Sequence, residues 1–254
     1  SLIFAFVIAI SLLFLLTKFK AEFVIKLWFF FVVTIALGIA INSFLPLGFY
    51  PSLIALIIAL PLAFIKIYKT NFIVHNITEL LIYPGIASVF VPILNLKTMI
   101  ILLIVISVYD MWAVWHSGIM QKMAKYQINN LKIFSGFFVP YVSKKVKEKI
   151  QAMKSLSKAQ LKKAGAKQIK VSVAILGGGD VVFPILVSGV MLKTYGFTTI
   201  LGLQIPLASL LVILGAVIGL FGLFLYSEKK KFYPAMPFIT AGIFLGMLIN
   251  WALL

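Results

Sequence analysis

The sequence predicts an all-α polytopic membrane protein with eight transmembrane helices. Of the 254 residues, 63% are hydrophobic and only 11% are charged. Long apolar runs recur along the chain, and a bilayer core of about 30 Å needs roughly 20 such residues per helix. The lysines gather at the ends of these runs. This composition is typical of a polytopic membrane protein and excludes a soluble domain with a large core.

Each predicted span is an apolar run bounded by polar or charged residues. The first run is short, but it lacks the basic region and the small-residue cleavage site of a signal peptide, so we interpret it as a span. The seventh is long enough to tilt. The predicted spans cover residues 2–16, 23–45, 50–67, 72–94, 98–118, 170–192, 198–226 and 235–254.

The lysines indicate an orientation when the connections alternate between the two sides of the membrane. All 23 basic residues are lysines, and 21 of them fall on one side, against Lys97 and Lys193 on the other. Such an excess marks the cytoplasmic face. Without the one long connection, 8 lysines still oppose 2. We therefore expect a cytoplasmic long loop and both chain ends outside.

This loop divides the chain into three regions. Residues 1–118 form an N-terminal membrane bundle, 119–169 a lysine-rich cytoplasmic loop, and 170–254 a C-terminal membrane bundle. Within the loop, residues 132–141 are apolar and β-prone, which predicts a short strand or an interfacial segment. The remainder favours a basic helix that is either solvated or held at the membrane surface by anionic headgroups. The net charge of +17 thus indicates a membrane partner, and we expect no nucleic-acid partner.

Three of the six acidic residues lie inside predicted spans, namely Glu79, Asp110 and Asp180. A charge within a span costs several kcal/mol, so it usually faces a partner or a water-filled cavity. Asp110 lies about eight residues before the cytoplasmic end of its span, and Asp180 about ten residues after the start of its own. At about 1.5 Å per residue, both lie roughly 12–15 Å from the same face. We predict that the two aspartates share one level. For Glu79, with His75 and Asn76 nearby, we expect a structural cluster.

Two carboxyl groups at one site suit acid–base chemistry. They cannot both ionise cheaply, so they hold one proton between them. The ionised group then takes a proton from water while the protonated group polarises a carbonyl. The absence of cysteine excludes a thiol nucleophile, and two histidines without an H-E-x-x-H pair exclude a metalloprotease. We expect no cofactor and no metal.

A secondary transporter or cation channel is the alternative, with the intramembrane aspartates as ion or proton sites. Two observations argue against it. The sequence shows no clear inverted repeat, and both aspartates lie toward one face, whereas transporter sites tend to lie near the midplane.

The residues around the aspartates resemble a known family. Tyr109-Asp110 lies in VISVYDMWAV, Gly177-Gly178-Gly179-Asp180 lies in ILGGGD, and Pro234-Ala235-Met236-Pro237 opens the last predicted helix. These segments are similar to the YD, GxGD and PAL motifs of presenilin and signal peptide peptidase, the GxGD intramembrane aspartyl proteases. The likeness extends over essentially the whole chain. One departure is Met236 in place of leucine, which conserves volume.

This resemblance implies a nine-helix fold, of which our eight spans would be helices two to nine, and the chain looks most like an archaeal or bacterial homologue. It implies an aspartic endopeptidase that cuts within or near the transmembrane helices of substrate proteins, with Asp110 and Asp180 as catalytic residues. It also implies supporting roles for Tyr109, Gly177, Gly178, Gly179, Pro234, Ala235, Met236 and Pro237.

A helical substrate must unwind before its amides can be attacked, and the freed backbone needs hydrogen-bonding partners. Residues 132–141 and 169–173 are predicted to supply them as β-strands at the cytoplasmic mouth.

Overall fold

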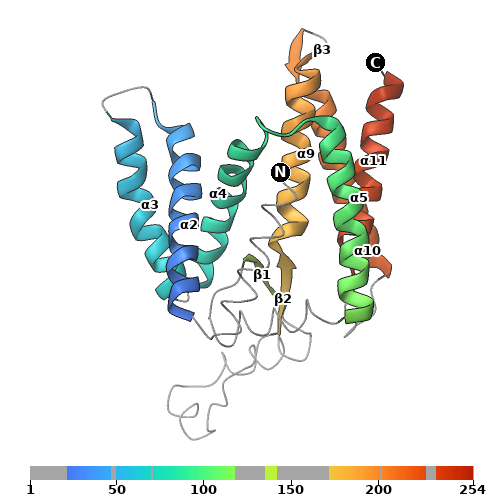
Figure 1. The fold of residues 1–254 in the computed structure, drawn as a ribbon. Coiled ribbons are helices and arrows are strands. Elements are labelled where there is room, and N and C mark those ends of the chain that lie inside the picture. Colours follow the sequence, from blue (N-terminus) through green and yellow to red (C-terminus); the bar gives the residue numbers. More distant parts are fainter. Residues whose placement is uncertain are drawn as a thin grey trace, which may run out of the picture.

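The computed structural model of the chain describes residues 22–46, 50–69, 71–117, 135–141, 172–200, 202–226 and 233–253. These residues form seven α-helices, a π-helical turn and four short strands (Figure 1). In chain order they are α2 (Glu22–Phe44), α3 (Pro51–Tyr68), α4 (Phe72–Phe90), α5 (Leu96–Trp112), η1 (Ala113–Ser117), β1 (Gly136–Tyr141), β2 (Ser172–Gly177), α9 (Gly178–Tyr195), β3 (Thr198–Ile200), β4 (Leu203–Ile205), α10 (Leu207–Tyr226) and α11 (Met236–Leu253).

The described part of the chain is mostly helical, as predicted, and six of its helices are long and apolar enough to cross a membrane. The predicted span 2–16 and most of the lysine-rich loop lie outside the described residues. The helices expected near 23–45, 50–67, 72–94, 98–118 and 235–254 are present with shifted ends.

Two predicted helix starts are wrong. The span expected at 170–192 begins as strand β2, and helix α9 starts only at Gly178. The span expected at 198–226 begins with the β3–β4 hairpin, and α10 starts at Leu207. Both misplaced stretches are short apolar runs, which hydropathy alone does not distinguish from helix. The fold is therefore helical with two small antiparallel sheets, and not purely α-helical.

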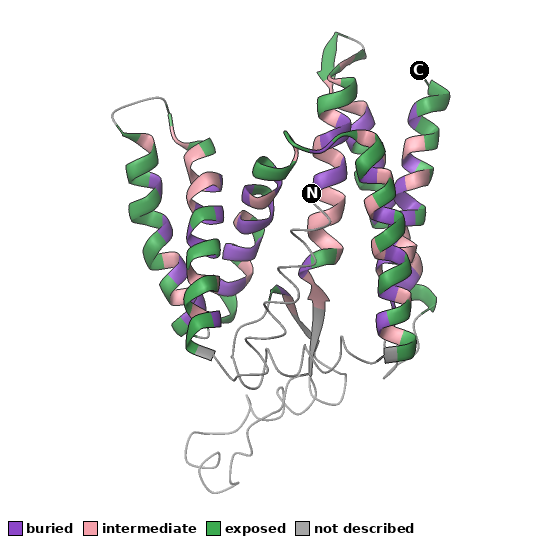
Figure 2. Cartoon of the chain, viewed as in Figure 1, coloured by how far each residue is buried: buried purple, intermediate pink, exposed green. Residues whose placement is uncertain are grey.

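The buried side chains form two main clusters. One lies among α2, α3 and α4, and the other lies mainly among α5, α9, α10 and α11 and includes Ala87 of α4. Helix α9 contacts α4 as well as α5, α10 and α11, and its residues Val182 and Ile185 pack against both clusters. The outward faces of the helices are largely exposed apolar side chains, as expected for contact with lipid (Figure 2). Helix α9 thus lies between the two buried clusters.

Helices α10 and α11 pack closely through glycines. A side chain at Gly215 of α10 would collide with the Gly242 carbonyl of α11, and one at Gly246 would collide with the Leu211 carbonyl. Small residues at four-residue spacing allow membrane helices to approach in this way. This contact holds α11 against α10.

Candidate active site

Asp110 lies near the end of α5 and is 4% exposed. Its Oδ2 accepts a hydrogen bond of 3.0 Å from the backbone N–H of Met236, and its carboxyl also accepts from the N–H of Ala235. The first N–H groups of a helix have no partner within it and carry partial positive charge. The start of α11 therefore offers Asp110 a ready-made anion site.

A second bond holds the same two helices in register. The Ser107 hydroxyl, one turn before Asp110, donates to the Thr240 hydroxyl at 2.8 Å. The Ala113 N–H, three residues after Asp110, donates to the carbonyls of both Tyr109 and Asp110, and the π-helical turn η1 begins at this residue. Such π-turns are rare overall but occur frequently at functional sites, and no feature of the sequence predicted this one.

Asp180 lies in the first turn of α9, not mid-helix as predicted. Gly177 is the residue that caps this helix, and its backbone N–H donates to the Asp180 carboxyl. The side chain folds back so far that a Cβ on Gly177 would lie 3.1 Å from Asp180 Oδ2. This is one half of a capping box, in which an acidic third residue reaches back to the capping N–H.

The three glycines before Asp180 have different surroundings. Gly178 is buried, and a Cβ there would lie 2.8 Å from the Ser135 hydroxyl and 2.9 Å from the Tyr83 hydroxyl. Gly179 is exposed, and a Cβ there would meet only the Phe183 ring, at 3.8 Å. Glycine at 178 therefore leaves room for Ser135, the residue before β1, and for Tyr83 of α4.

The two carboxyl groups belong to neighbouring helices. Helix α5 contacts α9, and the charge of Asp110 acts directly on Asp180. Each carboxyl is also bonded to backbone N–H groups at the start of a helix, Asp110 to α11 and Asp180 to α9. The repulsion between the two charges favours a shared proton.

The other predicted site residues divide into two groups. Pro234 and Met236 are buried, while Ala235 and Pro237 are half-buried, at the start of α11. The Tyr109 side chain is 53% exposed, and its ring lies 6.3 Å from that of Trp112. The structure therefore brings the glycines and the α11 segment to the two acids, and leaves the Tyr109 ring on an exposed side of α5.

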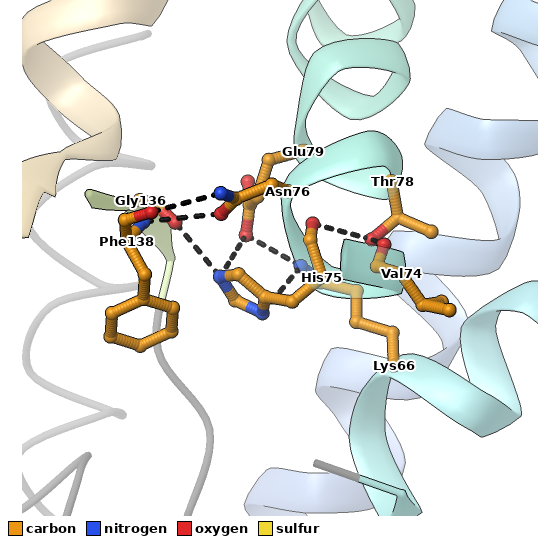
Figure 3. A network of polar contacts seen from close by, with 8 residues as sticks. All are labelled: Lys66, Val74, His75, Asn76, Thr78, Glu79, Gly136 and Phe138. Carbon is orange, nitrogen blue, oxygen red and sulfur yellow. Dashed lines mark hydrogen bonds and ion pairs between the residues drawn. The ribbon is translucent and has the colours of Figure 1, made fainter. Parts of the chain in front are cut away.

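A polar cluster beside the site was only partly foreseen (Figure 3). The Lys66 ammonium on α3 forms an ion pair of 2.6 Å with Glu79 on α4, and both side chains are almost fully buried. His75 and Asn76 on α4 bond to the backbone of β1. The spacing of the α4 residues was visible in the sequence. Lys66 was missed because we counted it among the lysines at the cytoplasmic side. Among the described residues, no group of three or more acids or histidines has metal-binding geometry.

Substituting Gly178 by alanine is expected to lower the free energy of unfolding by about 1–3 kcal/mol, the usual cost of overpacking. The added methyl group would press on Tyr83, whose ring is buried and unable to move aside easily. Thermal unfolding in detergent would measure the change. Gly179→Ala is the matched comparison because its site has room, and an equal loss in both variants would contradict the packing argument.

A membrane bundle that brings two carboxyl groups from neighbouring helices within direct electrostatic range has the arrangement of an aspartic protease. Residues 1–253 match the family model described as signal-peptide peptidase, presenilin aspartyl protease. The chain belongs to this family and is an intramembrane aspartyl protease, that is, an aspartic endopeptidase acting within the membrane. The family predicted from the three motifs is thereby confirmed.

Solved structures have the same fold. Two structures of a presenilin family intramembrane aspartate protease, in the C222 and P2 space groups, each match with a TM-score of 0.61 and 19% sequence identity. Each match covers 100% of this chain and 85% or 83% of the other. No curated protein matches this sequence.

Proposed function

We propose that Asp110 and Asp180 form the catalytic dyad of this protease. Their direct electrostatic interaction across the α5–α9 contact carries the proposal. The ionised member takes a proton from water as the water attacks the peptide carbonyl, and the protonated member donates a hydrogen bond to the carbonyl oxygen. The two roles belong to the pair jointly, because the pair titrates as one unit.

The segment from Pro234 to Pro237 supports the dyad through its backbone. The N–H groups of Ala235 and Met236 hold Asp110, while Gly177 holds Asp180. Backbone donors at the start of a helix are already fixed in place, so they need little rearrangement when charge shifts between the two acids. The side chains at 235 and 236 then matter mainly through the shape they give this helix start.

The substrate is a transmembrane helix that opens locally and adds as a strand to β2. Asn76 occupies both backbone groups of Phe138 on the outer edge of β1. The bond from the Gly178 N–H to the Ser135 carbonyl, together with the strand register, makes 137/176 and 139/174 the hydrogen-bonded pairs. The backbone groups of Val173 and Ile175 then point away from β1. Among the described residues no strand pairs with the outer edge of β2, so this edge is the better partner for an unwound substrate.

The chain as given spans the membrane eight times, as helices two to nine of a presenilin-like fold, with the lysine-rich loop cytoplasmic and the C-terminus outside. In support, the start of α2 and the end of α3 lie at the same end of the bundle as β2, and the start of α5 lies at the other (Figure 1). Lys26 and Lys69 belong to the first end and Lys97 to the second. Anionic headgroups at the first end would attract the loop lysines.

A matched pair of inhibitors tests the assignment. A peptide mimic with a hydroxyl group in place of the attacked carbonyl should inhibit cleavage of a transmembrane peptide by the purified protein at least about 100-fold more strongly than the same mimic without the hydroxyl. The reason is that the hydroxyl binds between the two carboxyl groups as the tetrahedral intermediate does. Equal inhibition by both mimics would contradict a dyad at this site.

Val173→Pro is expected to reduce kcat/KM for a transmembrane substrate by about 2- to 10-fold, the worth of one hydrogen bond. Proline removes the Val173 N–H, which points away from β1 because Val173 and Pro140 form a non-hydrogen-bonded pair. The β1–β2 ladder is therefore preserved. Val173→Ala shortens the side chain but keeps the N–H, and it is expected to cleave normally. Unchanged cleavage by the proline variant, or an equal loss in both, would contradict strand addition at this edge.

A further inference from the structure

Helix α4 holds strand β1 through one side-chain amide. The Asn76 Nδ2 donates to the Phe138 carbonyl at 2.9 Å, and the Asn76 Oδ1 accepts from the Phe138 N–H at 3.1 Å (Figure 3). One asparagine thus satisfies both backbone groups of a strand residue, as a neighbouring strand would do. Ring contacts between β1 and α4 add to this attachment, with Phe138 4.7 Å from His75 and Phe137 5.6 Å from Tyr83.

His75 makes a second attachment two residues along β1. Its Nε2 lies 2.8 Å from the Gly136 carbonyl oxygen. Because a carbonyl only accepts, Nε2 must carry the hydrogen. Its Nδ1 lies 3.4 Å from the Lys66 ammonium, which also binds Glu79. The buried ion pair between α3 and α4 therefore fixes the orientation of the ring that holds β1.

Contacts between β1 and the start of α9 link the position of β1 to that of Asp180. Gly136 lies opposite Gly177 in the β1–β2 register, and the Ser135 carbonyl accepts from the Gly178 N–H at 3.2 Å. Gly177 in turn donates to the Asp180 carboxyl. A shift of β1 on α4 would thus move the two glycines that place this carboxyl, while the rest of α9 is held by its own core contacts.

We propose that Asn76 and His75 are positioning residues for proteolysis, which fix β1 on α4 and thereby set the position of Asp180 at the start of α9. The inference rests on the proposed role of Asp180. Neither residue needs to touch the substrate. Their effect comes through the geometry of the carboxyl pair, where a misplacement of about 1 Å can reduce turnover about 100-fold.

Asn76→Leu removes both bonds to Phe138 at nearly constant volume, and Thr78→Val is its matched control. Thr78 is fully buried on the same helix, but its hydroxyl bonds only to the α4 carbonyls of Val74 and His75. We expect kcat to fall about 10- to 100-fold in the leucine variant. The control should keep its kcat, and the unfolding temperatures of the two variants should be similar.

Hydrogen exchange separates positioning from general destabilisation. In Asn76→Leu, the amides of 135–141 and 172–179 should exchange faster, while those of 186–195 should keep their protection. Faster exchange throughout α9, or a kcat equal to that of Thr78→Val, would overturn the proposal. This exchange pattern does not depend on catalysis, so it also tests the attachment if the aspartates prove not to be the dyad.

Conservative rescue at His75 gives an independent test. The Gln side-chain amide can donate to the Gly136 carbonyl in place of Nε2, whereas Leu cannot. His75→Gln should therefore retain several-fold more kcat than His75→Leu, with the same ranking in amide protection of 135–141. Equal kcat values in the two variants would count against the assigned role.

Discussion

Replacing either Asp110 or Asp180 by asparagine is expected to lower the rate of transmembrane peptide cleavage by about 100- to 10,000-fold, the usual contribution of a general acid or base. Asparagine has nearly the same size as aspartate, and its amide oxygen can still accept the Met236 or Gly177 N–H. The fold should therefore survive. What is lost is a group that can hold or release the shared proton.

The double variant should be no slower than either single variant, because the two carboxyl groups act as one unit. The wild-type kcat/KM should follow a bell-shaped pH profile. At low pH both acids are protonated and no base remains, whereas at high pH both are ionised and no proton donor remains. Turnover of peptide by either variant at close to the wild-type rate would exclude the dyad.

Glu79 shows why an intramembrane acid alone does not identify a catalytic residue. It is as deeply buried as Asp110, but it pairs with Lys66 at 2.6 Å, whereas the partners that the described residues offer Asp110 and Asp180 are backbone N–H groups, with the charge of Asp110 acting on Asp180. Among the described residues, a cationic partner is thus what separates a structural acid from the proposed dyad.

The sequence could predict the helices with continuous apolar runs and the two aspartates within them. It predicted a strand only as far as residue 173 and could not place the start of α9, because the rest of β2 (Ser172–Gly177) is as apolar as a helix and is held as a strand by pairing with β1. The sequence predicts that Asp180 lies about ten residues into a helix, whereas in the structure strand β2 ends only three residues before it. Asp180 nevertheless lies within range of the Asp110 charge, because it stands in the first turn of α9 and α9 contacts α5.

Lys66 was misjudged for a related physical reason. A lysine at the end of an apolar run predicts a solvated charge at the membrane surface. The turn between α3 and α4 is short, however, so the last turn of α3 packs against the first turns of α4. Lys66 consequently points at Glu79 and not at water. Only the pairing of the two helices, which hydropathy does not encode, reveals this.

Removing this cation is expected to have the largest effect on stability. Lys66→Met should lower the free energy of unfolding by about 3–5 kcal/mol, because it leaves the Glu79 carboxylate buried without its partner. The double variant Lys66→Met with Glu79→Leu should recover most of the loss, since a well-packed apolar pair often replaces a buried ion pair without cost. Unfolding of the purified protein in detergent, followed by heat or denaturant, measures both.

Lys69→Met is the matched control, three residues further along and exposed to solvent. It should change the free energy of unfolding by no more than about 0.5 kcal/mol. A similar loss at both lysines would mean that charge at this end of the bundle matters, and not the buried pair. The double variant could recover its free energy of unfolding and still have a lower kcat than the wild type. That result would separate two roles of the cluster: the ion pair holds α3 on α4, and the contact of Lys66 with His75 orients the ring that holds β1.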